Sequence, residues 1–365
     1  MHRTLLSKKR QRLLFGTDMS KTFCMVKIDG KDISSGLMPK LEKLSVTDKA
    51  GTSSDTCEIE IDDANGEVML PRVGVVLEVF LGPSREAAIR VFRGKADEVK
   101  SAGSRKNGMK LTVSAKGVDT KGKAKQPAQK HWDNKSLKDV MSEAGKDAGI
   151  NSVTISPELS GITRKYWAMQ NESFLHFGER IAREVGGTFK IQDDRAIIAE
   201  RNGGKSATGK SLPDFKAEYG VNLLSWEISP VLGRPRYKKT KVRHYDPKTA
   251  THKEEEVEIQ DSEAESDHTD RDVAADADEA KTKAKANKKS SEREKGGGSI
   301  SVNGSTIPQP EGNVILIGAR PGIDGTYRID GVQHDYSRKS GWTTKLDVKQ
   351  PQGDAGKDKR KAKAK

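Results

Sequence analysis

The stretch TCEIEIDD, residues 56–63, decides the fold class because apolar and acidic side chains alternate along it. Cys57, Ile59 and Ile61 are apolar, and the residues between them are glutamates. A period of two is typical of a β-strand that has one buried and one solvated face. The stretch therefore predicts such a strand.

Similar short segments lie on both sides of this strand, and each is bounded by turn-forming residues. Asp29-Gly30, directly after the first segment, is a turn-prone pair. Several short strands within about a hundred residues are typical of a small antiparallel barrel or sandwich. We expect a first β-barrel domain at 23–120, with further strands at 23–28, 73–81, 89–99 and 110–118.

The pattern changes at 122–130, where Gly, Lys and Gln predict a linker. Apolar residues then recur with helical spacing at 137–148 and 173–185, and in each case a serine is placed to cap the helix and glycine to end it. Two short strands, at 188–192 and 196–200, follow. This order predicts an α+β module at 131–215.

Strands return in the last third of the chain, where we expect a second β-barrel domain at 220–350. A charged insertion at 253–298 splits this domain. Its first part, 253–279, holds thirteen acidic residues against Lys253 and Arg271. Ala-rich spacing over 271–293 predicts a long charged helix. The fold class expected is thus α+β and mainly β. The expected strands lie at 223–228, 236–245, 299–302, 314–318, 327–332 and 342–348.

The charge of the chain is concentrated at its ends. The 365 residues include 66 Lys+Arg and 53 Asp+Glu, a net charge of +13, and residues 1–12 and 356–365 each contribute +5. We expect a basic extension at 1–22 and a basic tail at 351–365 that are solvated or contact neighbours in an assembly. Because the folded part keeps only +3, a dedicated nucleic-acid-binding face is disfavoured.

Two function classes are excluded by composition. No run approaches the roughly 18–20 apolar residues of a membrane helix, so we predict no integral membrane segment, and we find no signal-peptide pattern. The two cysteines, Cys24 and Cys57, are too few for a disulfide scaffold or a structural zinc site. Both are expected to be small core residues in a reducing cytoplasm.

One motif imitates an enzyme signature. Residues 204–211, GKSATGKS, satisfy the spacing of a phosphate-binding loop. Leu212-Pro213-Asp214 follows, however, and proline disfavours the helix whose N-terminus such a loop requires. The seven histidines form no metal-binding motif. We predict no catalytic residue, no cofactor and no metal, and therefore a protein that is not an enzyme.

Four stretches, taken in order, resemble one known family. They are TCEIEIDD at 56–63; SFLHFGERIA at 173–182 with GGTF at 186–189; YDPKT at 245–249; and YRIDGVQH at 327–334 with GWTTKL at 341–346. They are similar to the late control protein D family of contractile-tailed phages, which are baseplate hub proteins related to the hub part of VgrG. The family-signature positions are expected to be structural: Phe174, Phe177, Arg180, Gly187, Tyr245, Asp246, Pro247, Gly341, Trp342, Thr343 and Thr344.

The resemblance implies a mechanical function. Hubs of this kind form homotrimers in which two related β-barrels per chain give six similar units, and the ring adapts a sixfold tail tube to a threefold central spike. The implied partners are the tail tube protein, the spike protein and other baseplate (wedge) proteins, with DNA at most passing through the lumen. The implied location is the virion tail baseplate, after synthesis in the bacterial cytoplasm.

Three other functions stay open on the sequence. The chain could be the hub of a phage-derived bacteriocin or of a type VI-like injection machine. It could be a tail-associated peptidoglycan hydrolase, since glycosidase carboxylates need not be close in sequence. A nucleic-acid binder would show steep salt dependence.

Overall fold

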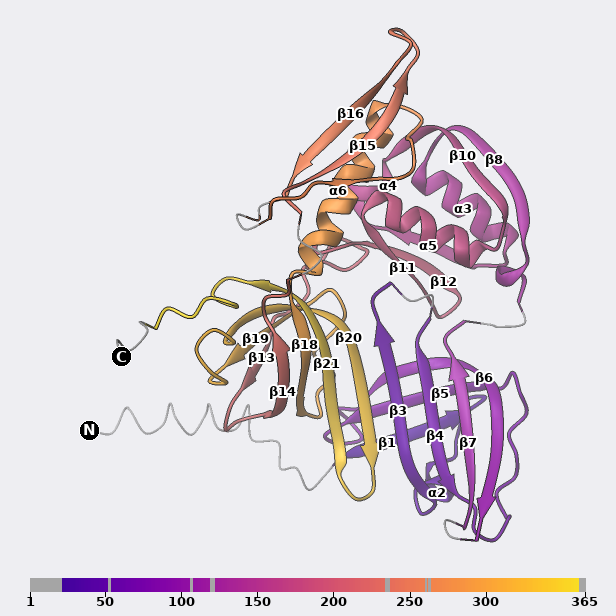
Figure 1. The fold of residues 1–365 in the computed structure, drawn as a ribbon. Helices are drawn as coiled ribbons and strands as arrows, with labels where there is room; N and C mark the ends of the chain where they lie inside the picture. Colours follow the sequence, from indigo (N-terminus) through magenta and orange to yellow (C-terminus); the bar gives the residue numbers. More distant parts are fainter. Residues whose placement is uncertain are drawn as a thin grey trace.

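The computed structural model describes residues 22–51, 54–105, 108–118, 122–233, 237–259, 261 and 264–360. Strands predominate, and 13 of them belong to one sheet (Figure 1). The fold is therefore mainly β, as predicted. The predicted N-terminal extension, apart from residue 22, and the last five residues of the basic tail lie outside the described residues.

The first β unit is built around the strand that the alternating stretch predicts. Cys57, Ile59 and Ile61 are buried and the glutamates between them are not. Asp29 and Gly30 both have positive φ, as a tight turn between two antiparallel strands requires. The elements are β1 (Phe23–Ile28), β2 (Lys31–Asp32), α2 (Ser34–Leu37), β3 (Leu41–Lys49), β4 (Thr56–Asp62), β5 (Val76–Gly82), β6 (Ile89–Ser104) and β7 (Gly108–Lys116).

The second β unit contains six strands around a core that includes Ile300, Tyr327 and Leu346. The charged insertion lies between β14 and β18, so the strands of this unit come from both sides of it. They are β13 (Phe215–Glu218), β14 (Leu223–Ser229), β18 (Gly297–Asn303), β19 (Asn313–Ile317), β20 (Gly325–Ser337) and β21 (Gly341–Gln352).

The two units are joined edge to edge. The second half of β20 pairs antiparallel with β3, from Gly331 opposite Lys49 to Tyr336 opposite Leu44. The resulting sheet runs without a break from β14 to β2. The two end strands, β14 and β2, do not pair with each other, so the sheet is open. The expected pair of closed barrels is therefore not present among the described residues. Closure depends on pairing between distant strands, which periodicity does not report.

The α+β module lies above the two β units in Figure 1. Its two longer helices have the predicted caps: Ser136 Oγ accepts from Asp139 N–H, Ser173 Oγ accepts from His176 N–H, and Gly186 ends the second helix with a φ of 76°. The prediction of a linker at 122–130 is wrong for residues 128–130, where β8 begins. The elements are η1 (Lys123–Lys125), β8 (Ala128–Ser136), α3 (Leu137–Asp147), β9 (Ser152–Ile155), α4 (Pro157–Ser160), β10 (Thr163–Glu172), α5 (Phe174–Val185), β11 (Gly187–Gln192) and β12 (Arg195–Glu200).

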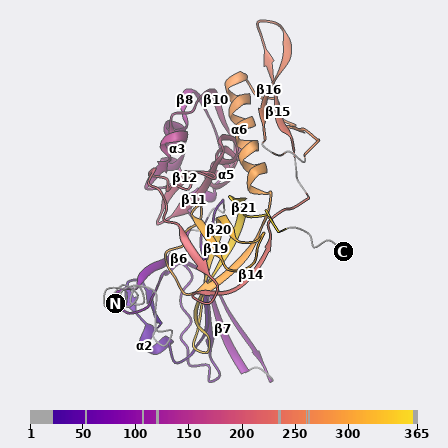
Figure 2. The same ribbon diagram turned by 90° about the vertical axis from the view of Figure 1, so that its left-hand side faces the viewer.

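The charged insertion forms a projecting arm beside the module (Figures 1 and 2). Its elements are β15 (Lys239–Asp246), β16 (Thr251–Glu258), β17 (His268–Thr269) and α6 (Ala277–Arg293). A long charged helix is thus present, but it starts at residue 277, and the glutamates of 254–258 lie in a strand. Cross-strand lysines of β15 pair with these glutamates and make the hairpin favourable, as in Lys239–Glu256 at 2.7 Å.

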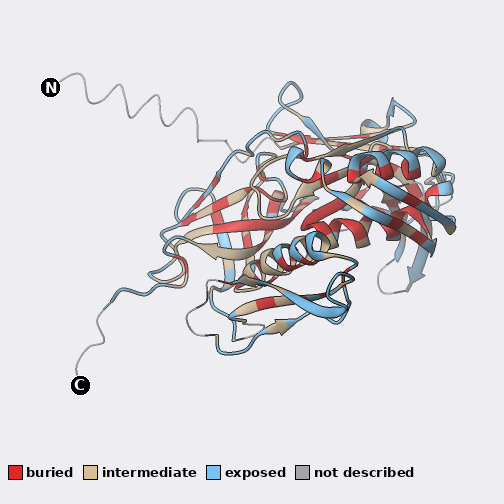
Figure 3. Ribbon diagram, turned by 90° about the horizontal axis from the view of Figure 1, so that it is seen from above, coloured by how far each residue is buried: buried red, intermediate tan, exposed pale blue. Residues whose placement is uncertain are grey.

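Buried apolar residues in the described part of the chain form separate clusters for the module, the first unit, the second unit and the arm. Figure 3 shows the buried residues along the strands and on one face of the helices, with exposed residues at the connections. Trp342 of β21 is an exception, because it packs into the cluster of the first unit. Its side chain therefore crosses the β3–β20 joint.

Candidate functional site

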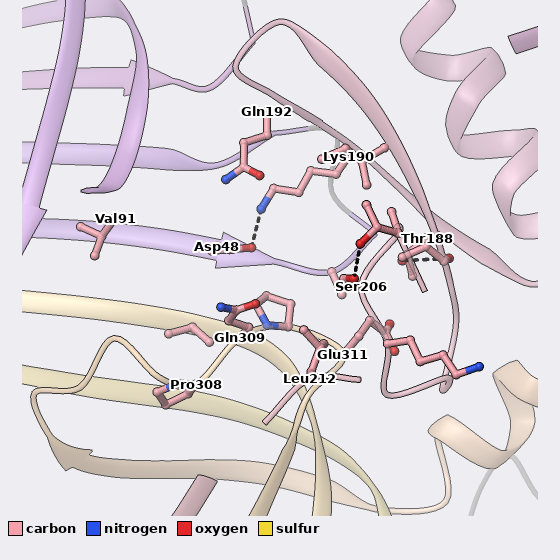
Figure 4. Close-up of a pocket in the computed structure, with 18 of the residues that line it drawn as sticks. Asp48, Val91, Thr188, Lys190, Gln192, Ser206, Leu212, Pro308, Gln309 and Glu311 are labelled. Atoms are coloured by element: carbon pink, nitrogen blue, oxygen red, sulfur yellow. Dashed lines mark hydrogen bonds and ion pairs between the residues drawn. The ribbon is translucent and has the colours of Figure 1, made fainter. Parts of the chain in front are cut away.

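A cavity of about 540 Å³ lies where the module meets both β units (Figure 4). One wall is the face of the β11–β12–β9 sheet that points away from the helices, with Thr188, Lys190 and Ile197. The opposite wall comes from the end of β3, the start of β6, β20 and the segment 306–311. The cavity therefore marks the junction of three parts of the fold.

Lys190 occupies the centre of this junction. Its Nζ lies 2.6 Å from Asp48 Oδ1 and 2.5 Å from Asp55 Oδ1, and both aspartates belong to the first β unit or its β3–β4 connection. Burial disfavours the ammonium, but the two carboxylates outweigh burial and raise the pKa of Lys190. Burial, reinforced by the nearby Asp48, raises the pKa of Asp55. Two carboxylates thus share one cation, and one of them holds a proton more readily than usual.

A second ionic contact joins the same two parts. Asp193, in the turn between β11 and β12, accepts from Arg90 Nη2 at 2.6 Å and lies 3.6 Å from Arg93 Nη1. Glu78 completes this group at 3.2 Å from Arg90. Two groups of ion pairs thus contribute to the contact between the module and the first unit, together with an isolated backbone bridge between Ser54 and Ile191.

His334 is the one histidine that lines the cavity as described, and its Nδ1 contacts both Thr344 and Trp342. Burial lowers its pKa to about 4, so the ring is neutral at pH 7. Its Nδ1 lies 3.1 Å from Thr344 Oγ1, and its ring centroid lies 5.8 Å from that of Trp342. The carboxylate of Glu311, another lining residue, is ion-paired with Arg293 at 2.8 Å. These groups hold the walls together and are not arranged around a shared reaction centre.

A buried ionic network attaches the end of α6 to the second unit. Arg293 contacts Glu311 and also Asp330 of β20, the latter at 2.9 Å, and all three side chains are less than 10% exposed. Its Nη1 also donates to Asn202 Oδ1 of the module at 3.1 Å. The network thus connects the arm, the module and the second unit at one point.

The phosphate-loop spacing at 204–211 adopts a closed turn. Lys205 and Ser211 form an antiparallel bridge, and the N–H of Ser206 donates to the carbonyl of Lys210. The next element is β13 and not a helix. The loop therefore lacks the helix N-terminus on which a phosphate site of that kind depends.

The signature positions in the module are core and junction residues. Phe174 and Phe177 are buried, and Phe174 packs edge-to-face on Phe189 at 5.8 Å. Arg180 donates to Glu172 and to the carbonyl of Ala168, the latter at 2.7 Å. A Cβ on Gly187 would lie 2.9 Å from Leu159 Cδ1 and 3.1 Å from the carbonyl oxygen of Ala199, so a larger residue would require the Leu159 side chain to move.

The other signature positions fall in two places. Tyr245, Asp246 and Pro247 form the exposed tip of the arm, where hydrogen bonds from Lys253 and from Lys248 N–H lower the pKa of Asp246 to about 2. Gly341, Trp342, Thr343 and Thr344 begin β21, and Gly341 has a φ of 69°. Thr344 Oγ1 accepts from Ser305 N–H at 3.0 Å. The structure does not bring the three groups of positions together.

The Lys190 junction was missed in the sequence. The only signal is a lysine between Phe189 and Ile191 in a predicted strand, and its two partners lie more than a hundred residues earlier. No three His, Cys, Asp or Glu side chains in the described ranges are placed to hold a metal ion. Nor does any helix in those ranges combine the length and apolar character needed to cross a bilayer.

Solved structures share this fold. A tail protein from Neisseria meningitidis matches 93% of this chain and 99% of its own length, with 16% identity and a TM-score of 0.69. A 43 kDa tail protein of prophage MuSo2 from Shewanella oneidensis gives a TM-score of 0.68 at 16% identity, over 89% of this chain and 97% of that one. A type VI secretion system component from E. coli gives 0.55 at 12% identity, over 92% and 79%.

Curated relatives carry a functional name. A probable baseplate hub protein of Escherichia phage P2 is 26% identical over 189 residues, which is 52% of this chain and 48% of the relative. Its counterpart in Escherichia phage 186 is 26% identical over 200 residues, 55% and 50% respectively. The match thus spans about half the length of these relatives. Since the profile described as phage tail baseplate hub (GPD) matches residues 54–340, the chain belongs to that family, as the four sequence stretches predicted.

Proposed function

We propose that three copies of this baseplate hub protein form a ring that adapts a sixfold tail tube to a threefold central spike. The observation that carries the proposal is the pair of β units joined side by side within one chain. Three chains would supply six β units, which fit a sixfold partner, while the chains themselves keep threefold symmetry.

The β3–β20 joint supports this arrangement because it is a lateral contact. Six residue pairs connect the two strands in register, and Trp342 packs across the joint. A joint of this kind fixes the angle between neighbouring units, as a ring requires. The open sheet also leaves end strands at which a further unit can be added.

The parts of the chain have different roles in this arrangement. The units at 23–120 and 220–350 build the ring as separate domains, and the module at 131–215 lies on one side of the ring. The signature positions stabilise the fold of these parts. The arm and the basic ends contact neighbouring baseplate proteins, including tube, spike and wedge proteins, with DNA at most in the lumen. The protein acts in the virion without catalysis.

Two alternatives make different predictions. The likeness to a type VI component at a TM-score of 0.55 favours a hub of a related injection machine or bacteriocin as the second candidate, and a DNA-filled head on the native particle would select the phage. A peptidoglycan hydrolase requires an available acid and base. The cavity acids Asp48 and Glu311 are instead each ion-paired.

The experiment is to measure the mass of the purified chain alone and with its tube and spike proteins, and then to image the complex. We expect three copies per complex and six similar β units around the axis. A chain that stays monomeric with both partners present would contradict the proposal.

A further inference from the structure

The sheet edges of this chain differ in how they are protected against pairing with another chain. β2 is two residues long and both are charged, and β16 carries Glu254, Glu255, Glu256 and Glu258. Short strands and charges are the usual means by which an edge is kept from pairing. β14 is seven residues long and Glu227 is its single charged residue, and its one irregularity is a register shift against β18 between Leu223 and Ser225.

Exposed apolar side chains surround the β14 edge. We call Tyr219, Val221, Leu224 and Ile317 the β14 patch; their exposed fractions are 64%, 51%, 50% and 37%. The ring of Tyr219 packs edge-to-face on Trp226 at 6.1 Å, and its N–H donates to the carbonyl of Ile317 at 3.0 Å. The patch is therefore held in a fixed arrangement.

A second apolar surface lies at the other side of the molecule. In the connection between β4 and β5, Met69, Leu70 and Val73 are 90%, 59% and 44% exposed, and we call them the Met69 loop. Hydrogen bonds hold both ends of the loop. Val68 N–H donates to Asp63 Oδ1 at 3.0 Å, and Gly74 N–H donates to the carbonyl oxygen of Ala96 at 2.7 Å. The hydrogen bond to Ala96 places the loop beside β6. In Figure 1, β6 and β14 lie on opposite sides of the β layer.

We propose that the β14 patch of one copy binds the Met69 loop of the next copy, head to tail. This inference rests on the ring proposed above and names the surfaces that close it. Two different apolar surfaces on opposite sides of one chain make a heterologous contact, which closes a ring when the rotation per copy is right. The charges are complementary, since Arg72 of the loop is basic, Glu227 of β14 is acidic, and both are exposed.

Disulfide trapping tests the contact in the full chain. The double variant Leu70→Cys/Leu224→Cys should give covalent dimers and trimers on oxidation, with a ladder that ends at three. Either single variant should give none, because a head-to-tail contact never places identical residues opposite each other. Cys24 and Cys57 are buried, so the unmodified chain measures the background level of cross-linking on oxidation.

A charge insertion provides the second measurement. Leu224→Lys should raise the dissociation constant of the trimer at least tenfold. Val273→Lys is the matched control, because Val273 is 49% exposed but lies in the arm, and it should leave the constant unchanged. Circular dichroism of both variants verifies folding, and the trapping result stands even where Leu224→Lys does not fold.

The outcomes separate the two proposals. Trimers that form without a Leu70–Leu224 cross-link, or that survive Leu224→Lys unchanged, overturn this contact and leave the ring intact. A cross-link in the Leu224→Cys single variant shows an isologous contact and also overturns it. No trimer, with or without tube and spike proteins, overturns the ring and the contact together.

Discussion

Two junctions in this molecule are built in different ways. The first and second β units are joined by backbone hydrogen bonds between β3 and β20 and by the buried Trp342. The module is joined to the first unit by Lys190 with two aspartates and by Asp193 with two arginines. Backbone hydrogen bonds do not titrate, and the ion pairs that also cross the joint, Lys43–Asp335 and Lys49–Asp330, are long, at 3.7 and 4.0 Å. The shorter ion pairs of the module junction depend more strongly on pH and salt. The chain thus combines a fixed β layer with a module whose attachment responds to conditions.

The largest effect is expected from Trp342→Ala, which removes the side chain that crosses the joint between the β units. Truncation of a buried tryptophan costs about 3–5 kcal/mol of unfolding free energy, and Trp342 is 8% exposed. Chemical denaturation measures the loss. Thr343→Ala, at the neighbouring position, is the control and should cost less than about 1 kcal/mol. Equal losses would show that Trp342 has no special role at the joint.

Lys190→Met should loosen the module without unfolding the β layer. The change leaves Asp48 and Asp55 without their cation, and because Lys190 and Asp48 remain partly solvated we expect about 2 kcal/mol, below the value for a fully buried pair. Hydrogen exchange should rise at β11 and stay unchanged at the β3–β20 joint. Lys289→Met, which removes the Lys289–Glu200 pair at 2.6 Å, is the control with a smaller expected effect. Faster exchange at the joint as well would contradict the separation of the two junctions.

The helices were predictable because their signals are local, and the junctions were not because theirs are distant. Ser136, Ser173 and Gly186 mark helix ends within a few residues of the apolar stripes that they cap. β3 was missed because a register shift between its residues 41 and 43 interrupts the alternation of buried side chains.

The same reason explains the errors in the arm and the site. The glutamates of β16 resemble the start of a charged helix until the lysines of β15 are placed opposite them. β8 was missed because Trp132 is its single buried residue. Lys190 and Asp48 are separated by 142 residues, so no local pattern could relate them.

Asp55 should make the module junction weaker as pH rises. Its pKa of about 7 in the folded protein lies above its ordinary value of 3.8, so the folded state holds the proton more tightly. The stabilisation is complete below about pH 4 and is lost as pH rises through 7. His334 has the opposite effect on stability. Because its pKa is lowered in the folded protein, its contribution to stability rises as pH increases from 4 to 6.5.

A comparison with Asp55→Asn isolates the aspartate, since His334 is common to both proteins. From pH 5 to pH 8 the unmodified chain should lose stability relative to the variant, as measured by hydrogen exchange at β11. Parallel pH profiles would show that Asp55 is ionised throughout.

The smallest effect is expected from Asp193→Asn at the second ionic contact. Arg90 and Arg93 are more than a third exposed, so the contribution should be about 0.5–1 kcal/mol at low salt. It should fall further in 1 M salt, where the Debye length is about 3 Å. Thermal unfolding at two salt concentrations measures the difference. A salt-independent loss would point to packing and not charge.

The proposed ring is defined by its copy number and symmetry, and imaging of the chain assembled with the tube and spike proteins proposed as its partners tests it most directly. The account predicts three chains whose two β units form six similar segments around one axis, with the module outside this layer. One chain per particle, or six chains, would contradict it.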